Sequence, residues 1–134
     1  MQTFEGGCLC GAIRYRASGE PVNQSYCHCT MCRRSAGAPV VSWLTMAAEG
    51  FAFTQGQPAR YDSSDIAYRE FCPRCGTQLT YRARAKPHEV DITSASLDEP
   101  ERAPPKDHIW TRSHIRWFEV ADELPRHERE RVPR

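Results

Sequence analysis

Short stretches of the chain alternate apolar and polar residues, which is the pattern of half-buried β-strands. In residues 6–18, Ile13 and Tyr15 point to one side of an expected strand, whereas Arg14 and Arg16 point to the other. Alternation recurs in residues 51–54, 67–72 and 77–84. Two further strands are expected in residues 37–46, which are rich in β-branched and aromatic side chains, and in residues 88–97. The pattern predicts an all-β domain built of short strands.

Turn and helix signals separate these strands. The chain contains 10 prolines and 8 glycines, which favours many turns and few long helices. Residues 98–107 hold several prolines, so they are not expected to continue a strand or a helix. A brief helix is expected over residues 30–35, because Gly37 and Pro39 follow it closely. Residues 108–121 are mixed and aromatic, and their element type is left open.

The length of 134 residues suits one domain. We expect this domain over residues 1–125, followed by a charged tail in residues 126–134 that is frayed and solvated. The formal charge of +1 provides no overall attraction to nucleic acid or to an anionic membrane. The start of the chain lacks the features of a signal peptide, and no apolar stretch approaches the roughly 20 residues of a membrane span. These features predict a cytoplasmic protein without nucleic-acid or membrane partners.

The seven cysteines fall into three tight groups. The first group is Cys8 and Cys10, the middle group is Cys27, Cys29 and Cys32, and the last group is Cys72 and Cys75. Cytoplasmic thiols stay reduced and an odd number cannot pair completely, so metal binding explains the clusters better than disulfides do. Isolated cysteines are often small buried side chains, but clustering does not fit that explanation. The segment CPRCG is the strongest signal, because Pro73 pre-sets a turn and Gly76 tolerates a positive φ.

Two arrangements of the ligands are open from spacing alone. In one, Cys29 and Cys32 join the last group as the four ligands of a zinc ribbon. In the other, the first and last groups share one ion, and the middle group forms a second centre by itself. Residues two apart in a strand project to the same face, so the first group can converge on one ion, and so can Cys27 and Cys29. This geometry favours the second arrangement.

A centre made by the middle group alone has three protein ligands, which is the layout of a catalytic zinc site with an open position. In a strand, His28 would point away from Cys27 and Cys29, so it is not the expected fourth ligand. Arg33 and Arg34 follow at once. They form either an exposed polar face or an anchor for a substrate carboxylate beside the metal.

Three thiolates on Zn²⁺ leave one net negative charge on the centre. Such electron-rich ligands suit a soft partner, namely an incoming thiol that is held deprotonated. The thiolate can then attack a small carbonyl carbon or be released from such an adduct. Activation of water is less favoured, because hydrolytic zinc usually has nitrogen and oxygen ligands.

Several segments carry a family resemblance: GGCLCGAIRY, CHCTMCRRSAGAP, FCPRCGTQL, SLDEP, HIW and W…DELP occur in this order. They resemble the motifs of the glutathione-dependent formaldehyde-activating enzymes, also called the centromere-protein-V domain family, over nearly the whole chain. The resemblance implies a zinc-dependent, mostly β fold of stacked antiparallel sheets with short helical turns, similar to the Mss4-like "β-tent" folds.

The resemblance also implies one structural and one catalytic zinc ion. The structural ligands are then Cys8, Cys10, Cys72 and Cys75. The catalytic ligands are then Cys27, Cys29 and Cys32. The implied activity is that of a carbon–sulfur lyase that joins glutathione, or another small thiol, to formaldehyde or another small aldehyde. A thiol and an aldehyde are thus the expected small-molecule partners.

Two other functions compete with the enzyme. Small cysteine-rich β domains also serve as non-catalytic zinc modules that bind a protein or a nucleic acid, although the balanced charge disfavours nucleic acid. A crowded thiol cluster can also sense redox state. Trp43, Trp110 and Trp117 are expected in core or rim packing, and His108 and His114 in surface or hydrogen-bonding roles.

Overall fold

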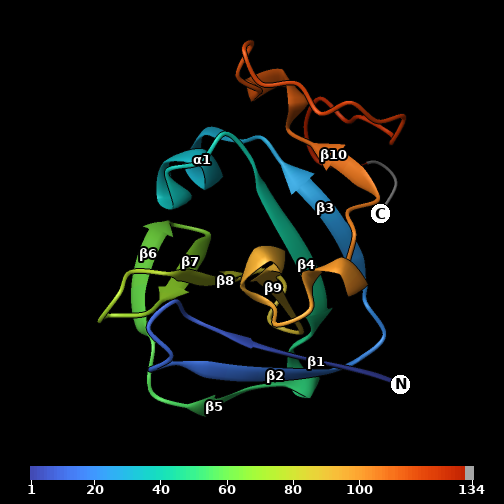
Figure 1. The fold of residues 1–134 in the computed structure, drawn as a ribbon. Helices are drawn as coiled ribbons and strands as arrows, with labels where there is room; N and C mark the ends of the chain where they lie inside the picture. Colours follow the sequence, from blue (N-terminus) through green and yellow to red (C-terminus); the bar gives the residue numbers. More distant parts are fainter. Residues whose placement is uncertain (132–134) are drawn as a thin grey trace.

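The computed structural model of the protein describes residues 1–131 and contains two β-sheets (Figure 1). The strands of the small sheet are β1 (Gln2–Gly7), β2 (Arg14–Gly19) and β5 (Phe51–Gln55), in the order β1-β2-β5. The strands of the large sheet are β3 (Asn23–Cys27), β4 (Val41–Ala47), β6 (Ala59–Ser64), β7 (Ala67–Phe71), β8 (Gln78–Ala83), β9 (Glu89–Thr93) and β10 (Asp107–Ile109). Their order in the sheet is β10-β3-β4-β9-β8-β7-β6.

All strand pairs are antiparallel except one at the edge of the large sheet. There, β10 runs parallel to β3, with Ile109 opposite Cys27. Strands β3 and β4 form an antiparallel pair in which Cys27 lies opposite Val41. The late segment around β10 therefore lies directly beside the point where β3 reaches the middle group of cysteines.

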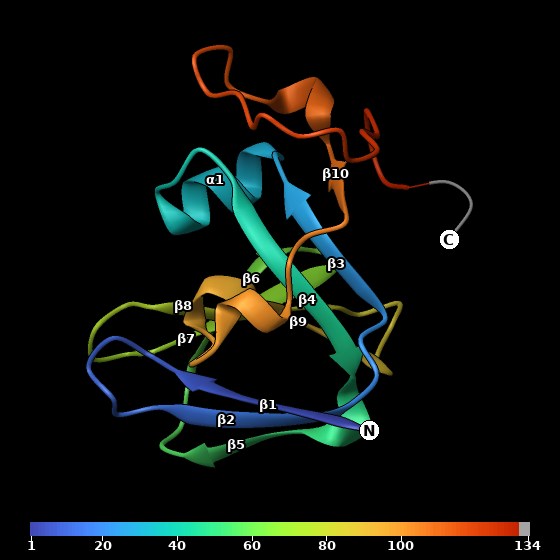
Figure 2. The same cartoon turned by 45° about the vertical axis from the view of Figure 1, so that its right-hand side comes forward.

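The hydrophobic core lies between the two sheets, which stack on each other as Figures 1 and 2 show. Phe4 and Tyr15 enter it from the small sheet, and Leu44, Met46 and Ile92 enter it from the large sheet, each at most 1% exposed. Burial of such side chains contributes about 2 kcal/mol each to stability. The alternation of the sequence therefore specifies which face of each strand turns inward.

A close backbone approach at Gly6 brings the small sheet against the chain segment after β9. The Tyr15 hydroxyl forms a hydrogen bond with Ser96 Oγ at 2.6 Å. A Cβ atom at Gly6 would stand 2.4 Å from the Tyr15 hydroxyl oxygen and 2.5 Å from the Ser96 carbonyl oxygen. Only glycine fits this position without displacing the neighbouring strand.

Helical structure is limited to short pieces. The helix α1 (Thr30–Ala36) begins after Cys29, whose side chain accepts a hydrogen bond from the Cys32 N–H, and it ends at Gly37, which has φ 63°. Four 3₁₀ turns, η1 (Ala48–Gly50), η2 (Ser94–Ser96), η3 (Pro100–Arg102) and η4 (Thr111–Ser113), complete the helical content of the described residues. The predicted all-β fold of stacked sheets with short helical turns is confirmed.

Several local expectations differ from the structure. The predicted helix over residues 30–35 is confirmed. Residues 98–107 were not expected to form a helix, but they contain the 3₁₀ turn η3. A proline is tolerated at the start of a helix, because the N–H that it lacks would have no partner there. Strand β6 was not expected, since its residues are mostly polar. The open segment after residue 107 holds β10 and η4.

The expectation of a frayed, solvated charged tail is wrong in part for residues 126–131, because hydrogen bonds hold their backbone against the fold. The backbone N–H of His127 donates to the His108 carbonyl at 2.8 Å, and that of Trp110 donates to the Arg129 carbonyl at 3.0 Å. The Arg131 guanidinium donates to both carboxylate oxygens of Asp107, at 2.7 and 2.9 Å. Arg131 is therefore paired within the fold, whereas Glu128, Arg129 and Glu130 are exposed as expected. The remaining residues of the tail lie outside the described residues. Over the described chain, no helix has the length and apolar composition that crossing a membrane requires.

Candidate metal centres

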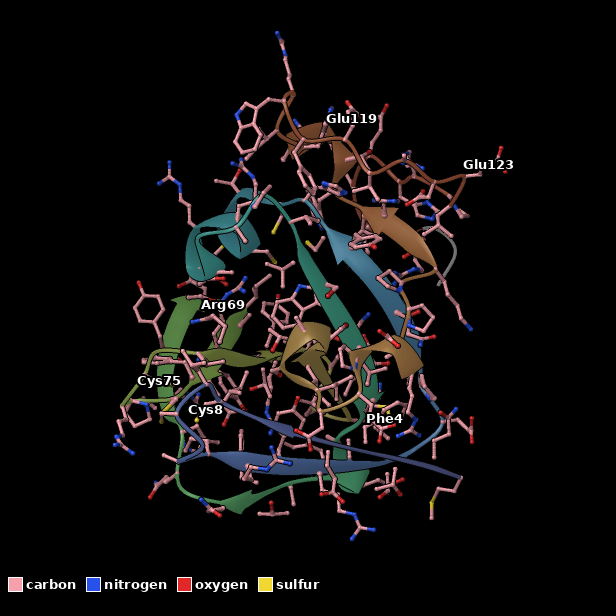
Figure 3. The ribbon with its side chains drawn as sticks, in the orientation of Figure 1. Phe4, Cys8, Arg69, Cys75, Glu119 and Glu123 are labelled. Atoms are coloured by element: carbon pink, nitrogen blue, oxygen red, sulfur yellow. The ribbon has the colours of Figure 1, made fainter. Side chains whose placement is uncertain are left out.

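The first and last groups of cysteines meet where two strand connections come together. Cys8 and Cys10 lie between β1 and β2, and Cys72 and Cys75 lie between β7 and β8 (Figure 3). Their four sulfur atoms all lie within 4.8 Å of one another. The Sγ–Sγ distance is 3.6 Å from Cys8 to Cys10 and 3.8 Å from Cys10 to Cys72. A tetrahedron of sulfurs around zinc has an edge of about 3.8 Å, so this donor set fits a four-sulfur metal centre.

Backbone N–H groups support the sulfur atoms of this four-cysteine centre. The N–H of Ile13 donates to Cys8 Sγ at 3.2 Å, and the N–H of Cys75 donates to Cys72 Sγ at 3.4 Å. Hydrogen bonds from the Thr77 hydroxyl and then from its backbone N–H lower the pKa of Cys75 to about 5. These contacts favour the thiolate form that metal binding requires.

The middle group forms a separate three-cysteine centre. The Sγ atoms of Cys27, Cys29 and Cys32 lie within 4.8 Å of one another, and this group shares no member with the four-cysteine centre. This grouping is that of the second arrangement, so the zinc-ribbon arrangement, in which Cys29 and Cys32 join the last group, is not the one adopted. The three sulfurs are a donor set that can hold a soft metal ion.

Local structure explains how residues 27–32 bring these three sulfurs together. Cys27 ends β3, Cys29 caps α1 in an extended conformation, and Cys32 lies in the first turn of α1. The N–H of Cys32 donates to Cys29 Sγ at 3.3 Å. Hydrogen bonds from the thiols of Cys27 and Cys32 are the main cause that lowers the pKa of Cys29. The same contacts raise the pKa of Cys27, so in the absence of a metal ion the cluster favours negative charge on Cys29 alone.

A cavity of about 390 Å³ opens beside the three-cysteine centre, and all three cysteines line it. Aromatic and apolar side chains form much of its wall, namely Trp43, Ile66, Tyr81, Ile109 and Trp110. A second hollow of about 180 Å³ shares five lining residues with it, so the two are contiguous. The four-cysteine centre contributes no residue to this cavity, although Cys8 and Cys75 line a separate hollow of about 570 Å³. The two centres therefore differ in their number of sulfurs, four against three, rather than in whether a hollow lies beside them.

Trp110 stands at the wall of the cavity in a strained backbone conformation. Its φ of 57° is the only positive value of a non-glycine residue in the described part of the chain. Such a conformation costs on the order of 1 kcal/mol and is concentrated at functional sites. Trp43 is 7% exposed and contributes to the same wall, whereas Trp117 is 76% exposed and lies outside it. Two of the three tryptophans thus border the three-cysteine centre rather than only filling the core.

The two arginines expected to anchor a substrate do not line the cavity. Arg33 donates to Thr30 Oγ1 at 3.3 Å on α1, and Arg34 is exposed. Their role as substrate anchors stays a prediction. Arg69, which the sequence analysis missed, is 3% exposed, lines the cavity and donates to Cys32 Sγ at 3.7 Å. One sequence signal could have indicated that Arg69 is buried. Arg69 lies two residues after Ala67 in an alternating strand, so both side chains project to the same, inward face.

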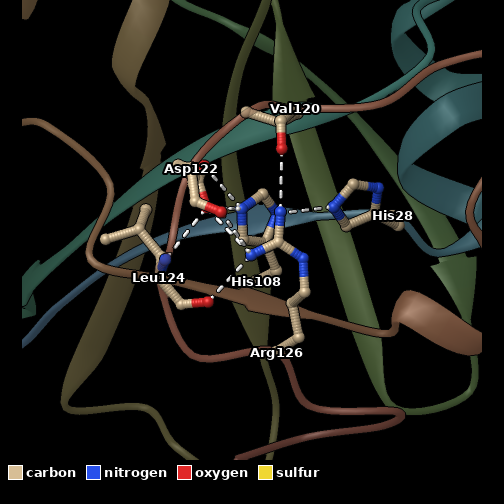
Figure 4. Close-up of polar contacts among 6 residues, drawn as sticks. All are labelled: His28, His108, Val120, Asp122, Leu124 and Arg126. Carbon is tan, nitrogen blue, oxygen red and sulfur yellow. Dashed lines mark hydrogen bonds and ion pairs between the residues drawn. The ribbon is translucent and has the colours of Figure 1, made fainter.

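A buried polar chain holds the backbone between Cys27 and Cys29 (Figure 4). As expected, His28 is not grouped with the sulfurs; its Nε2 lies 2.8 Å from His108 Nδ1. His108 is 1% exposed, and its Nε2 lies 3.0 Å from the nearer carboxylate oxygen of Asp122. Burial would raise the pKa of Asp122, but hydrogen bonds from His108, Leu124 and Arg126 outweigh it and lower the pKa to about 2.

Asp122 fixes one end of this network, because its carboxylate accepts from His108 Nε2. The second hydrogen bond joins His108 Nδ1 to His28 Nε2, and one proton lies between these two nitrogens. The loop after β10 therefore buttresses the cysteine segment from behind. His114 is exposed and bonds through Nδ1 to the Thr111 carbonyl, which is the hydrogen-bonding role expected for it.

Comparisons with known proteins agree with this geometry. The sequence model of the family "glutathione-dependent formaldehyde-activating enzyme" matches residues 3–113. An "uncharacterized lyase" of Schizosaccharomyces pombe is 35% identical over 81 residues, which are 60% of this chain and only 58% of that protein. A Halomonas elongata protein, provisionally named as a glutathione-dependent formaldehyde-activating enzyme, is 28% identical over 126 residues, with 87% of this chain and 80% of that protein covered.

A solved structure shares the fold. The crystal structure of a Rhodobacter sphaeroides protein matches with a TM-score of 0.58 at 25% identity, over 70% of this chain and 87% of that one. The family match extends over most of the chain and includes both groups of cysteines that the structure brings together. The protein therefore belongs to the glutathione-dependent formaldehyde-activating enzyme family.

Proposed function

We propose that this protein is a carbon–sulfur lyase that joins a small thiol, with glutathione as the first candidate, to formaldehyde or a similar small aldehyde. One observation carries the proposal. Three converging cysteine sulfurs border a cavity of about 390 Å³, whereas the other centre already brings four sulfurs together away from it. Three protein ligands and an adjacent cavity are the layout expected of a metal centre that receives a substrate.

The proposed reaction is a balanced addition. The thiol sulfur forms a bond to the carbonyl carbon, the π electrons of the carbonyl move to its oxygen, and the proton lost from sulfur ends on that oxygen. A zinc ion held by Cys27, Cys29 and Cys32 would supply the positive charge that keeps a thiol deprotonated at neutral pH. Zinc is the proposed ion because every donor in both centres is sulfur. The reverse reaction cleaves the same carbon–sulfur bond.

The proposed reaction also requires a site that excludes water and has room for the thiol, and the cavity walls fit both requirements. The rings of Trp43, Tyr81 and Trp110 provide apolar surface that excludes water from the sulfur centre. The contiguous hollow reaches Lys86 and Arg131, so the body of a peptide-sized thiol has room beyond the reacting atoms. The names of the family and of the Halomonas elongata protein support the same substrates. A cytoplasmic location, where thiols stay reduced, remains part of the proposal.

The proposal is tested by the rate of adduct exchange, since the adduct also forms without a protein. Exchange between glutathione, formaldehyde and S-hydroxymethylglutathione is measured by NMR with the zinc-loaded protein and without it. Acceleration is expected for the protein and for Ala36→Ser, a control on the exposed side of α1 that leaves the sulfurs untouched. Cys29→Ser should return the rate to the spontaneous value.

Two outcomes would refute the enzyme assignment. One is full acceleration by Cys29→Ser after metal removal, which would make the three-cysteine centre irrelevant to the reaction. The other is no acceleration by the zinc-loaded protein with any small thiol and aldehyde. That result would favour the non-catalytic zinc module, and binding assays against proteins and against DNA at several salt concentrations would then follow.

A further inference from the structure

Arg69 occupies a buried position in direct contact with the three-cysteine centre. It lies on β7 opposite Tyr81 of β8, and Figure 3 shows it on the side of β7 that faces α1. Its Nη2 donates to Cys32 Sγ at 3.7 Å and its Nη1 donates to Ser35 Oγ at 3.2 Å. The guanidinium carbon lies 4.9 Å from the centre of the Tyr81 ring. These contacts fix the guanidinium plane between the sulfur centre and the aromatic wall.

Arg69 forms no ion pair with a carboxylate of residues 1–131. Its buried Nε has no hydrogen-bond partner among these residues. Arginine stays charged in proteins, and a buried charge without compensation is strongly unfavourable. Asp91 and Glu130 line the same cavity but lie beyond ion-pairing distance of Arg69. The cluster of cysteine sulfurs, which Arg69 contacts, is the nearer group that can compensate its charge, provided that the sulfurs are thiolates. The position of Arg69 is therefore matched to an anionic centre.

A charge count shows what this cation changes. Three thiolates with a divalent ion carry one net negative charge, and an incoming thiolate would raise this to two. With Arg69 included, the ion, the three thiolates and the guanidinium are together neutral before the thiolate arrives and carry a single negative charge afterwards. Asp91 and Glu130 add further negative charge to the wall of the same cavity. Arg69 is also the only lysine or arginine in the described wall of the cavity. Like-charge repulsion against an anionic substrate is thus reduced by this one side chain.

We infer that Arg69 enables an anionic thiol to enter the three-cysteine centre, by balancing the charge of the sulfurs and of the arriving thiolate rather than by anchoring a carboxylate of the substrate. This inference rests on the proposed function for its thiol substrate. It makes Arg69 a positioning residue that acts through the charge of the centre. A guanidinium that contacts a ligand sulfur is suited to that role.

The test measures thiol binding in the absence of any aldehyde. Protein loaded with cobalt(II) is titrated with 2-mercaptoethanol and with 3-mercaptopropionate, and binding is followed by the sulfur-to-cobalt charge-transfer absorption. The two thiols share the sulfur but differ in the carboxylate. For Arg69→Gln we expect both affinities to fall by the same factor, about 10- to 100-fold, in the range of other outer-shell partners of metal ligands. Arg69→Lys, which keeps the charge, should retain most of the affinity.

Controls separate charge from folding. Arg84→Gln removes an arginine that is 43% exposed and pairs with Asp62, and it should bind both thiols as the unaltered protein does. Metal content and circular dichroism are measured for each variant. If Arg69→Gln loses the metal ion of the three-cysteine centre while Arg69→Lys keeps it, the positive charge of residue 69 is what stabilises this centre, which supports the inference. Loss of that ion from both variants would overturn the inference in favour of a packing role.

Two binding patterns would also overturn the inference. If Arg69→Gln weakens only 3-mercaptopropionate, Arg69 anchors a carboxylate. If it weakens neither thiol while both metal ions are bound, the charge of Arg69 has no part in thiol entry. Failure of the proposed function gives a different result. If both thiols bind in an Arg69-dependent way but adduct exchange is not accelerated, the inference about Arg69 stands and the proposed reaction is refuted.

Discussion

The metal-loaded four-cysteine centre should contribute more to stability than the three-cysteine centre, because of the length of chain that each one closes. The four-cysteine centre joins Cys8 to Cys75 and closes a loop of about 68 residues, whereas Cys27 and Cys32 enclose about six. The loop-closure relation for cross-links gives about 4 kcal/mol for the long loop and about 2 kcal/mol for the short one. With about 4 °C per kcal/mol for a domain of this size, the expected falls in melting temperature are about 16 °C and about 8 °C.

Two double variants isolate this difference. Cys8→Ser with Cys10→Ser removes one side of the four-cysteine centre, and Cys27→Ser with Cys29→Ser is the matched change in the other centre. Each pair combines one buried and one more accessible cysteine, so the cost of the serines themselves is similar. Thermal unfolding is followed by circular dichroism with zinc present, and bound metal is counted in each variant.

The result that would refute the reasoning is an equal fall in both variants or a larger fall in the second. Either would show that the chain between Cys8 and Cys75 is already restrained by strand pairing and needs no metal to close it. Chelation of the unaltered protein should reproduce at least the larger fall, since both ions are then lost.

Two further predictions concern the packing around the centres. Gly6→Ala should lower the free energy of unfolding by at least about 2 kcal/mol in urea titrations, because its Cβ would stand 2.4 Å from the Tyr15 hydroxyl oxygen and 2.5 Å from the Ser96 carbonyl; an unchanged urea midpoint would show that the sheets shift freely at this point. Asp122→Ala should cost about 1–3 kcal/mol, because it leaves the buried His108 Nε2 without its acceptor, and it should speed amide exchange next to the three-cysteine centre; exchange that is unchanged there would separate this network from the cysteine segment.

Much of the fold could be predicted because the strands carry their own signal. Ile13 and Tyr15 are buried, whereas Arg16 on β2 is exposed, as an alternating strand requires. Strand β6 gave no such signal, because it lies at the edge of the large sheet and buries little of its surface. The pairing of Arg131 with Asp107 was hidden for another reason: a run of charges looks solvated until its partner, 24 residues away, is placed beside it.

The candidate site also contains residues that could be predicted from the sequence and residues that could not. The cysteines were predictable because ligand spacing is a local property, and Cys29 and Cys32 are joined by one helical turn. Arg69 and Trp110 were not predictable as parts of the site, because strand pairing and a positive φ bring them to the cavity from distant segments. The network through His108 depends on the parallel pairing of β10 with β3, which could not be predicted from any pattern in the sequence.

The sulfurs of the three-cysteine centre and the walls around them come from separate parts of the chain. Residues 27–32 provide the sulfurs, while Trp43, Ile66, Tyr81 and Trp110 stand on other strands and loops. Mutations in the wall can therefore reshape the chamber without touching the donor atoms. A combinatorial library confined to those four positions is thus the natural starting point for changing which small molecules the cavity admits, with the sulfur donors left intact.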